Sequence, residues 1–206
     1  MPSTVLDIDI DIDTPHGPAR AHVTKVRGAH GAVVLGHGAG GGVAARDLTA
    51  ASEAALASGF SVALVEQPYR VAGRRSPAPA RQLDAAWTAV IAHLRSGPLK
   101  RVALVTGGRS SGARVACRTA AETGAIGVLC LAFPVRPPGR PDAPSRQDEL
   151  DAVQVPVLVV QGDRDPFGMP VPGPARTVVT VKGDHSLRGD LEAVRTAVSR
   201  WLGQLL

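Results

Sequence analysis

Hydrophobic and acidic residues alternate near the start of the chain. From residue 6 to residue 13, each Leu or Ile is followed by an Asp. An alternation with a period of two is typical of a β-strand that buries one face. A turn at residues 15–18 and a second strand at residues 20–26 predict an antiparallel hairpin. Outward carboxylates discourage pairing with another sheet edge. A calcium site is a weaker alternative, because alternate side chains of a strand form a row and do not converge on one ion.

Continuous apolar runs replace this alternation from residue 32 onward. Runs of this kind indicate strands that are covered on both faces, as in a parallel sheet. The expected strands are residues 32–35, 61–65, 102–106, 127–133, 155–161 and 177–181. Together with the hairpin they predict a mostly parallel sheet of eight strands.

Helical periodicity fills most of the segments between these strands. Apolar residues recur at spacings of three and four over residues 83–94 and again over residues 191–205. Further helices are expected at residues 47–57 and 111–121, ended by Gly59 and Gly124. The alternation of strands and helices predicts one doubly wound α/β domain over residues 1–206, with helices on both faces of the sheet.

Two proline-rich connections limit what can cover the sheet. Four of the residues 134–141 are prolines, which predicts a loop and no helical cap over residues 134–150. Residues 163–175 also contain four prolines and are too few for a full crossover helix. No large cap is therefore expected.

A serine-centred turn follows the strand at residues 102–106. Residues 108–112 read Gly-Arg-Ser-Ser-Gly and lead from this strand directly into a helical segment. A nucleophile elbow has this order: a strand, a sharp turn with serine at its tip, and a helix. Gly108 and Gly112 supply the small residues that the close approach of strand and helix requires. Ser110 is therefore the candidate nucleophile.

Polar residues follow several strands, at the sheet edge where ligands of open α/β sheets bind. His185 is the candidate general base that takes a proton from Ser110. A carboxylate would orient the imidazole and stabilise its charged form. Asp165 is preferred for this role, and Asp163 is the alternative, otherwise a turn residue that caps local N–H groups. Asp184 is expected to face solvent. The order serine, acid, histidine is that of the α/β-hydrolase triad.

A glycine-rich segment, His-Gly-Ala-Gly-Gly-Gly at residues 37–42, follows another strand. Glycines such as Gly38 and Gly40 let backbone N–H groups approach a developing oxyanion closely. The expected donors are the N–H groups of Ala39 (or Gly40) and Ser111. A phosphate-binding loop is the alternative, but the chain has no G-x-x-x-x-G-K-[ST] pattern and no acidic residue placed for a dinucleotide ribose. No cofactor and no metal are expected.

Composition narrows the class of protein without changing this picture. The 206 residues fit one domain, and 44% hydrophobic with 20% charged residues is ordinary for a globular protein. Aromatic residues make up 3%, so the core must be mainly aliphatic. The net charge of +5 raises nucleic-acid binding as an alternative. However, the arginines are spread along the chain without an aromatic stacking platform, so a solvated basic surface and no nucleic-acid partner are expected.

Targeting signals and cysteines bear on the compartment. The first residues contain no basic segment followed by an apolar run, so no signal peptide is expected. No apolar stretch approaches the ~18 residues of a membrane span. Cys117 and Cys130 are expected to be buried free thiols, because a disulfide needs an oxidising compartment. A cytoplasmic protein without a membrane partner is predicted.

With these motifs in view, the chain resembles the α/β-hydrolase superfamily. The resemblance is to a compact, cap-less branch similar to dienelactone-hydrolase-like bacterial proteins and to the animal testis-expressed and histone-acetyltransferase-complex relatives. It implies the same roles for Ser110, Asp165 and His185. The dienelactone hydrolases proper carry cysteine at the nucleophile position, so the serine argues against their substrate. The matching stretches are LGHGAGG at 35–41, GGRSSGARVA at 107–116, QGDRDPFG at 161–168 and GDHS at 183–186.

The sequence therefore predicts a serine hydrolase, in particular a carboxylesterase that acts on short acyl esters through an acyl-enzyme intermediate. Its expected partner is a small-molecule acyl substrate. A thioesterase or peptidase of the same fold is one alternative. A non-catalytic hydrolase-fold module for protein interaction is the other, because some relatives serve as complex subunits.

Overall fold

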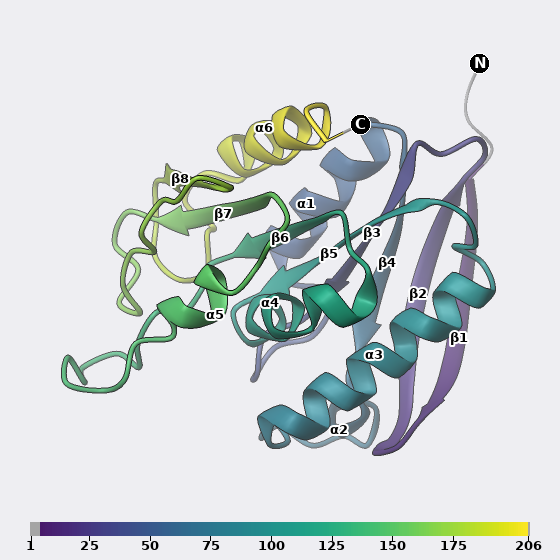
Figure 1. The fold of residues 1–206 in the computed structure, drawn as a ribbon, viewed down its shortest axis with the longest axis horizontal. Coiled ribbons are helices and arrows are strands. Elements are labelled where there is room, and N and C mark those ends of the chain that lie inside the picture. The colour runs from purple at the N-terminus through teal and green to yellow at the C-terminus, as the bar shows by residue number, and fades with distance from the viewer. Residues whose placement is uncertain (1–4, 206) are drawn as a thin grey trace.

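Eight strands form one sheet in the computed structural model, which describes residues 5–205 (Figure 1). Residues 1–4, on which the expected absence of a signal peptide partly depends, and residue 206 lie outside this range. The spatial order is β1-β2-β4-β3-β5-β6-β7-β8; β2 pairs antiparallel with β1 and β4, and all other pairs are parallel. The predicted fold class is confirmed. The strands are β1 Val5–Thr14, β2 Gly17–Val26, β3 Gly31–Gly36, β4 Phe60–Glu66, β5 Ala103–Arg109, β6 Gly127–Leu131, β7 Val157–Gly162 and β8 Arg176–Val181.

The N-terminal hairpin has the two faces that the alternating sequence predicts. Ile12 is buried and packs in a cluster with Trp87 of α3 (Ala80–Ser96). On the other face, aspartates of β1 lie opposite polar residues of β2 and hydrogen-bond to them. These side-chain pairs are Asp7 with Thr24 at 2.8 Å, Asp9 with His22 at 2.7 Å and Asp11 with Arg20 at 2.7 Å. Each of these three carboxylates thus has its own cross-strand partner.

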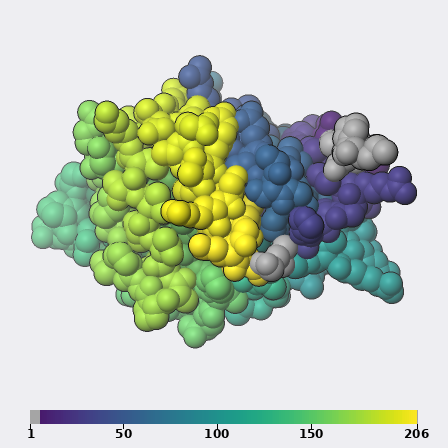
Figure 2. All heavy atoms as spheres, turned by 90° about the horizontal axis from the view of Figure 1, so that it is seen from above, coloured from purple at the N-terminus to yellow at the C-terminus, as the bar shows by residue number. Residues whose placement is uncertain are grey.

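Helices cover both faces of the sheet, as predicted. On one face α1 and α6 lie side by side, the blue and yellow segments of Figure 2. On the other face lie α3, α4 and α5 (Figure 1). The remaining helix bounds are α1 Arg46–Ala57, α2 Pro68–Val71, α4 Ser111–Thr123, α5 Gln147–Asp151 and α6 Leu191–Leu202. Gly124 ends α4 in the left-handed conformation (φ 63°), as its position in the sequence predicts.

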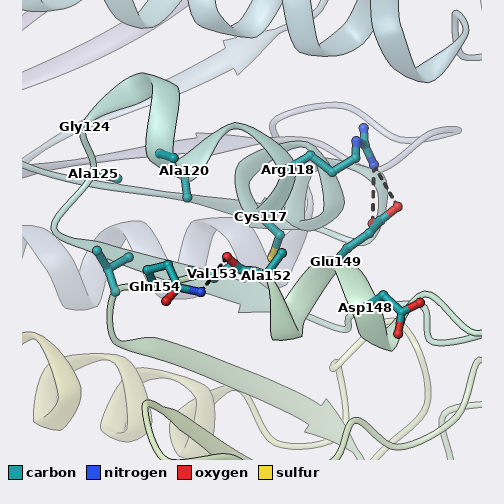
Figure 3. Close-up of a pocket in the computed structure, with 12 residues that line it drawn as sticks. Cys117, Arg118, Ala120, Gly124, Ala125, Asp148, Glu149, Ala152, Val153 and Gln154 are labelled. Atoms are coloured by element: carbon teal, nitrogen blue, oxygen red, sulfur yellow. Dashed lines mark hydrogen bonds and ion pairs between the residues drawn. The ribbon is translucent and has the colours of Figure 1, made fainter.

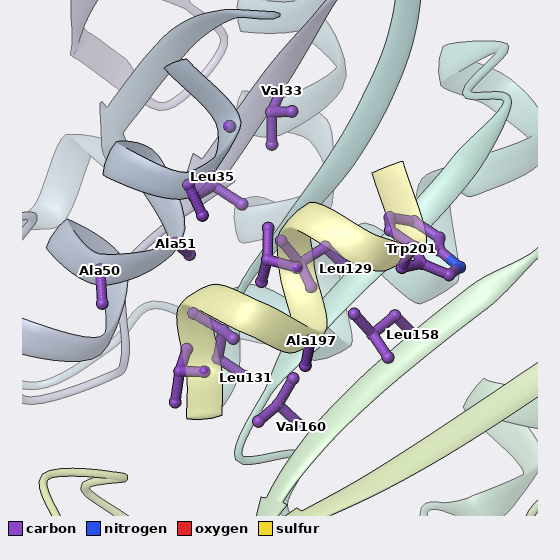
Figure 4. Packing of buried hydrophobic residues seen from close by; sticks show 14 of the residues in the cluster. Val33, Leu35, Ala50, Ala51, Leu129, Leu131, Leu158, Val160, Ala197 and Trp201 are labelled. Atoms are coloured by element: carbon purple, nitrogen blue, oxygen red, sulfur yellow. The ribbon is translucent and has the colours of Figure 1, made fainter. Parts of the chain in front are cut away.

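Aliphatic side chains fill the space between the sheet and the α1–α6 pair (Figure 4). Leu129 and Leu131 of β6 are fully buried there, and Leu35 of β3 lies in the same cluster. Trp201 of α6 and Phe60 of β4 are aromatic members of the same cluster. Strands buried on both faces explain why the sequence shows continuous apolar runs and no alternation.

The connection between β6 and β7 corrects one prediction. Residues 134–150 were expected to form a loop throughout, but the segment ends in α5. Leu150 anchors this helix in the core, and the Gln147 amide donates to the Asp151 carboxylate one turn later. Five helical residues after a run of prolines are too few to produce a readable periodicity. The connection between β7 and β8 has no helix, as predicted, and residues 5–205 carry no large cap.

The two cysteines are buried free thiols, as predicted. Their Sγ atoms lie 3.5 Å apart between α4 and β6. The hydrogen bond with Cys117, together with burial, raises the pKa of the Cys130 thiol well above its ordinary value. Separately, none of the helices within residues 5–205 combines the length and the apolar character that crossing a bilayer requires.

Candidate active site

Ser110 lies at the sharp turn between β5 and α4. Its backbone φ of 52° is in the left-handed region, which residues other than glycine rarely adopt. Its N–H donates to the carbonyl oxygen of Leu131 on the neighbouring strand, at 2.9 Å. Gly112 lets α4 begin against β3, because a Cβ at this position would lie 2.4 Å from the Gly36 carbonyl oxygen. The strand, strained turn and helix expected around Ser110 are therefore present.

Three side chains that are far apart in the sequence form one hydrogen-bonded line. His185 Nε2 lies 2.9 Å from Ser110 Oγ, and His185 Nδ1 lies 2.8 Å from Asp165 Oδ2. The Asp165 side chain is completely buried, whereas the imidazole is 16% exposed. If Nδ1–H donates to the carboxylate, Nε2 is left to accept the serine O–H. An imidazole held in this way can take the hydroxyl proton as the oxygen attacks.

Two residues that were assigned no role from the sequence hold Asp165 in place. Gln161 Nε2 donates to Asp165 Oδ2 at 2.8 Å, and the Phe167 N–H donates to Asp165 Oδ1 at 2.9 Å. The Phe167 ring also stacks on the His185 imidazole, with 4.1 Å between ring centroids. Both residues belong to the stretch QGDRDPFG at 161–168, which carries part of the family resemblance, and Gln161 is also the one polar side chain of the apolar strand β7.

The two other aspartates near His185 have different partners. Asp163 was expected to cap local N–H groups, and this was wrong: its Oδ1 accepts the N–H of Gly183, twenty residues away. It therefore ties the loop after β7 to the loop after β8. Asp184 is exposed, as expected, and accepts the N–H of Ser186 at 2.9 Å. Hydrogen bonds from Ser186 lower the pKa of the Asp184 carboxyl.

His37 begins the glycine-rich loop after β3 and is only 3% exposed. Its Nδ1–H donates to the Gly38 carbonyl oxygen at 2.8 Å, and its Nε2 accepts the Gln67 N–H at 3.1 Å. Burial lowers the pKa of His37, which keeps the ring neutral and able to make both bonds. The Tyr69 hydroxyl donates to the Ala39 carbonyl oxygen at 2.8 Å, which fixes the next peptide of the loop.

This loop lies directly beside Ser110. A Cβ added to Gly38 would lie 3.6 Å from the Ser110 Cβ, while Gly40 has open space around it. Across residues 5–205, the N–H groups of Ala39 and Ser111 donate to no other protein group. Both are thus available to a bound oxygen atom next to the serine.

A cavity of about 670 Å³ lies elsewhere, between the C-terminal half of α4 and the segment that begins with α5 (Figure 3). Its lining includes Cys117, Ala120 and Val153, and an Arg118–Glu149 ion pair lies at one end. None of the site residues predicted from the sequence lines it. In the described part of the chain, no group of three or more His, Cys, Asp or Glu side chains is placed to hold a metal ion.

A sequence profile described as "Alpha/beta hydrolase domain" matches residues 29–200, most of the chain. The chain belongs to the α/β-hydrolase family. Comparison with curated proteins finds no match. The resemblance to testis-expressed and histone-acetyltransferase-complex proteins stays a prediction.

Solved structures support this α/β-hydrolase fold over nearly the whole chain. XC6422 from Xanthomonas campestris, described as an α/β serine hydrolase without lid, superposes with a TM-score of 0.78 at 22% identity, covering 97% of this chain and 95% of that one. Dienelactone hydrolase from Anabaena variabilis gives a TM-score of 0.75 at 18% identity, with 97% and 98% covered. Est1E from Butyrivibrio proteoclasticus gives 0.75 at 17% identity, with 96% and 98% covered. At these identities the likeness concerns the fold.

Proposed function

We propose that this α/β-hydrolase is a serine hydrolase, specifically a carboxylesterase for short acyl esters. The observation that carries the proposal is the line Ser110–His185–Asp165, with 2.9 Å and 2.8 Å between its successive polar atoms. Residues 5–205 hold no large cap, Ser110 is half-buried and the His185 side chain is partly exposed, which fits an open site for small acyl substrates. The similar structures include an α/β serine hydrolase and a dienelactone hydrolase, which supports ester chemistry.

The reaction would begin with attack of Ser110 Oγ on the ester carbonyl carbon. The hydroxyl proton moves to His185 Nε2, and Asp165 stabilises the imidazolium that forms. The carbonyl oxygen becomes negatively charged and accepts hydrogen bonds from the N–H groups of Ala39 and Ser111. The bond to the alkoxy group then breaks, and His185 returns the proton to the leaving oxygen. Water, deprotonated by His185, attacks the acyl-enzyme in the same way and releases the carboxylic acid.

The proposal includes a cytoplasmic location and a small-molecule acyl substrate. The location is supported by two buried thiols that are free although their Sγ atoms lie 3.5 Å apart. The substrate class is supported by the open, cap-less site.

Steady-state hydrolysis of p-nitrophenyl acetate tests this function. The variant that lacks the nucleophile, Ser110→Ala, is compared with the same substitution at the next residue, Ser111→Ala. Ser110→Ala should reduce turnover to the level of buffer, or to a residual rate of about 10⁻³ or less of the wild-type rate. Ser111→Ala keeps its backbone N–H and should retain wild-type turnover. Turnover by the wild type that survives Ser110→Ala, or no turnover by the wild type, would overturn the proposal. The second result would favour an interaction module.

A further inference from the structure

Arg109 immediately precedes Ser110 and extends from the end of β5 toward two other parts of the chain. Its Nε–H donates to Asp47 Oδ2 on α1 at 2.8 Å. Its Nη2 donates to the backbone carbonyl oxygen of His185 at 3.0 Å. The Asp47 side chain is 1% exposed and the Arg109 side chain 19%, so this ion pair is largely shielded from solvent. One guanidinium thus joins β5, α1 and the segment that carries the imidazole.

The same guanidinium touches the glycine-rich loop. A Cβ added to Gly38 would lie 2.7 Å from Arg109 Nη1, so the loop backbone packs directly on the arginine. Gly38 precedes Ala39, whose N–H is proposed to bind the oxyanion. The arginine therefore contacts both segments that must be in register with Ser110, and it does so from the last residue of β5, directly before Ser110.

Asp47 offsets the positive charge that Arg109 places near His185. Burial raises the pKa of Asp47, and the neighbouring Arg109 opposes that effect. The carboxylate balances the charge of the guanidinium, which would otherwise repel the imidazolium that forms on His185 during the reaction. An uncharged side chain at position 109 would lack the several N–H groups with which a guanidinium donates to a carboxylate and to a carbonyl oxygen at once.

We infer that Arg109, held by Asp47, is a positioning residue that sets the His185 segment and the glycine-rich loop after β3 relative to Ser110. The inference rests on the proposed ester hydrolysis and adds to it two residues outside the Ser110–His185–Asp165 line. Small displacements of catalytic groups, of about 1 Å, can reduce rates about 100-fold. Loss of Arg109 should accordingly lower kcat and leave KM nearly unchanged, since the substrate contacts remain.

A double-variant experiment separates positioning from stability. Arg109→Met leaves Asp47 buried without its partner and should lower Tm by at least about 6 °C. It should also lower kcat for p-nitrophenyl acetate about 10- to 100-fold, with KM within about twofold of the wild type. Arg109→Met combined with Asp47→Asn removes the unpaired charge and should restore most of Tm without restoring kcat. Arg118→Met, which breaks the Arg118–Asp84 ion pair between α4 and α3, is the matched control and should keep wild-type kcat.

The possible results distinguish a positioning role of Arg109 from a purely stabilising one. Low kcat with recovered Tm in the double variant supports positioning. Recovery of kcat together with Tm would mean that Arg109 acts only through stability, and unchanged kcat in Arg109→Met would mean that it does not position the site; either result overturns the inference while the proposed function stands. A wild type that neither hydrolyses the ester nor reacts with a fluorophosphonate at Ser110 overturns both.

Discussion

The neutral imidazole of His37 makes the loop beside Ser110 sensitive to acid. Its Nε2 accepts the Gln67 N–H. Protonation would turn Nε2 into a donor that faces the Gln67 N–H, and this hydrogen bond would be lost. Because burial lowers the pKa of His37 in the folded protein, the unfolded chain binds this proton at higher pH than the folded chain. The contribution of His37 to stability is therefore complete above the unfolded pKa of about 6.5. It is lost as the pH falls from there through the lower folded pKa.

His37→Gln should weaken this dependence. The free energy of unfolding of the wild type, measured with urea, is expected to fall between about pH 7.5 and pH 5, and the variant should show a shallower fall because glutamine does not titrate. His93→Gln makes the same chemical change at an exposed position and should leave the wild-type slope intact. Equal slopes for the wild type and His37→Gln would exclude His37 as the source.

Among elements, the junction of β5 with α4 depends on close backbone contact with β3. The position of Gly112 leaves no room for a side chain, since both the carbonyl oxygen and the carbonyl carbon of Gly36 would lie within 2.6 Å of a Cβ. Backbone atoms in a central strand cannot move aside cheaply. The glycine is thus required by the packing of helix against strand, and the orientation of Ser110 depends on that packing.

Gly112→Ala should lower the free energy of unfolding by about 1–3 kcal/mol, because the added methyl group forces the helix away from the strand. Gly41→Ala is the matched control: no atom lies within 4 Å of its added Cβ, and its stability should stay within about 0.5 kcal/mol of the wild type. Urea denaturation with a common slope measures both. A tolerated alanine at position 112 would show that the junction is less rigid than its geometry indicates.

The elements that the sequence predicted are those with long local patterns. The eight strands, the long helices and the serine turn are each encoded by periodicity or by adjacent residues. The short α5 escaped because five residues carry too little periodicity, and its formation depends on burying Leu150. The bond from Asp163 to Gly183 escaped because the two loops meet only in the folded sheet.

At the scale of the whole molecule, the strand order brings the site together. The carboxyl ends of β5, β7 and β8 lie at one edge of the sheet, so the order of motifs along the chain was enough to propose Ser110, Asp165 and His185 as neighbours. The supporting contacts could not be read in this way. Arg109 and Asp47 are 62 positions apart, and neither belongs to a motif that indicates pairing. Their contact follows from the packing of α1 against the sheet.

Covalent capture of Ser110 probes the proposed nucleophile itself. On incubation with a fluorophosphonate, Ser110 Oγ should displace fluoride from phosphorus, so the intact mass of the wild type should rise by one phosphonyl group (the probe less HF), and peptide mapping should place that group on Ser110. Ser111→Ala should react at the wild-type rate, and Ser110→Ala should not react. An unchanged mass of the wild type, or a label on any other residue, would show that Ser110 is not the nucleophile.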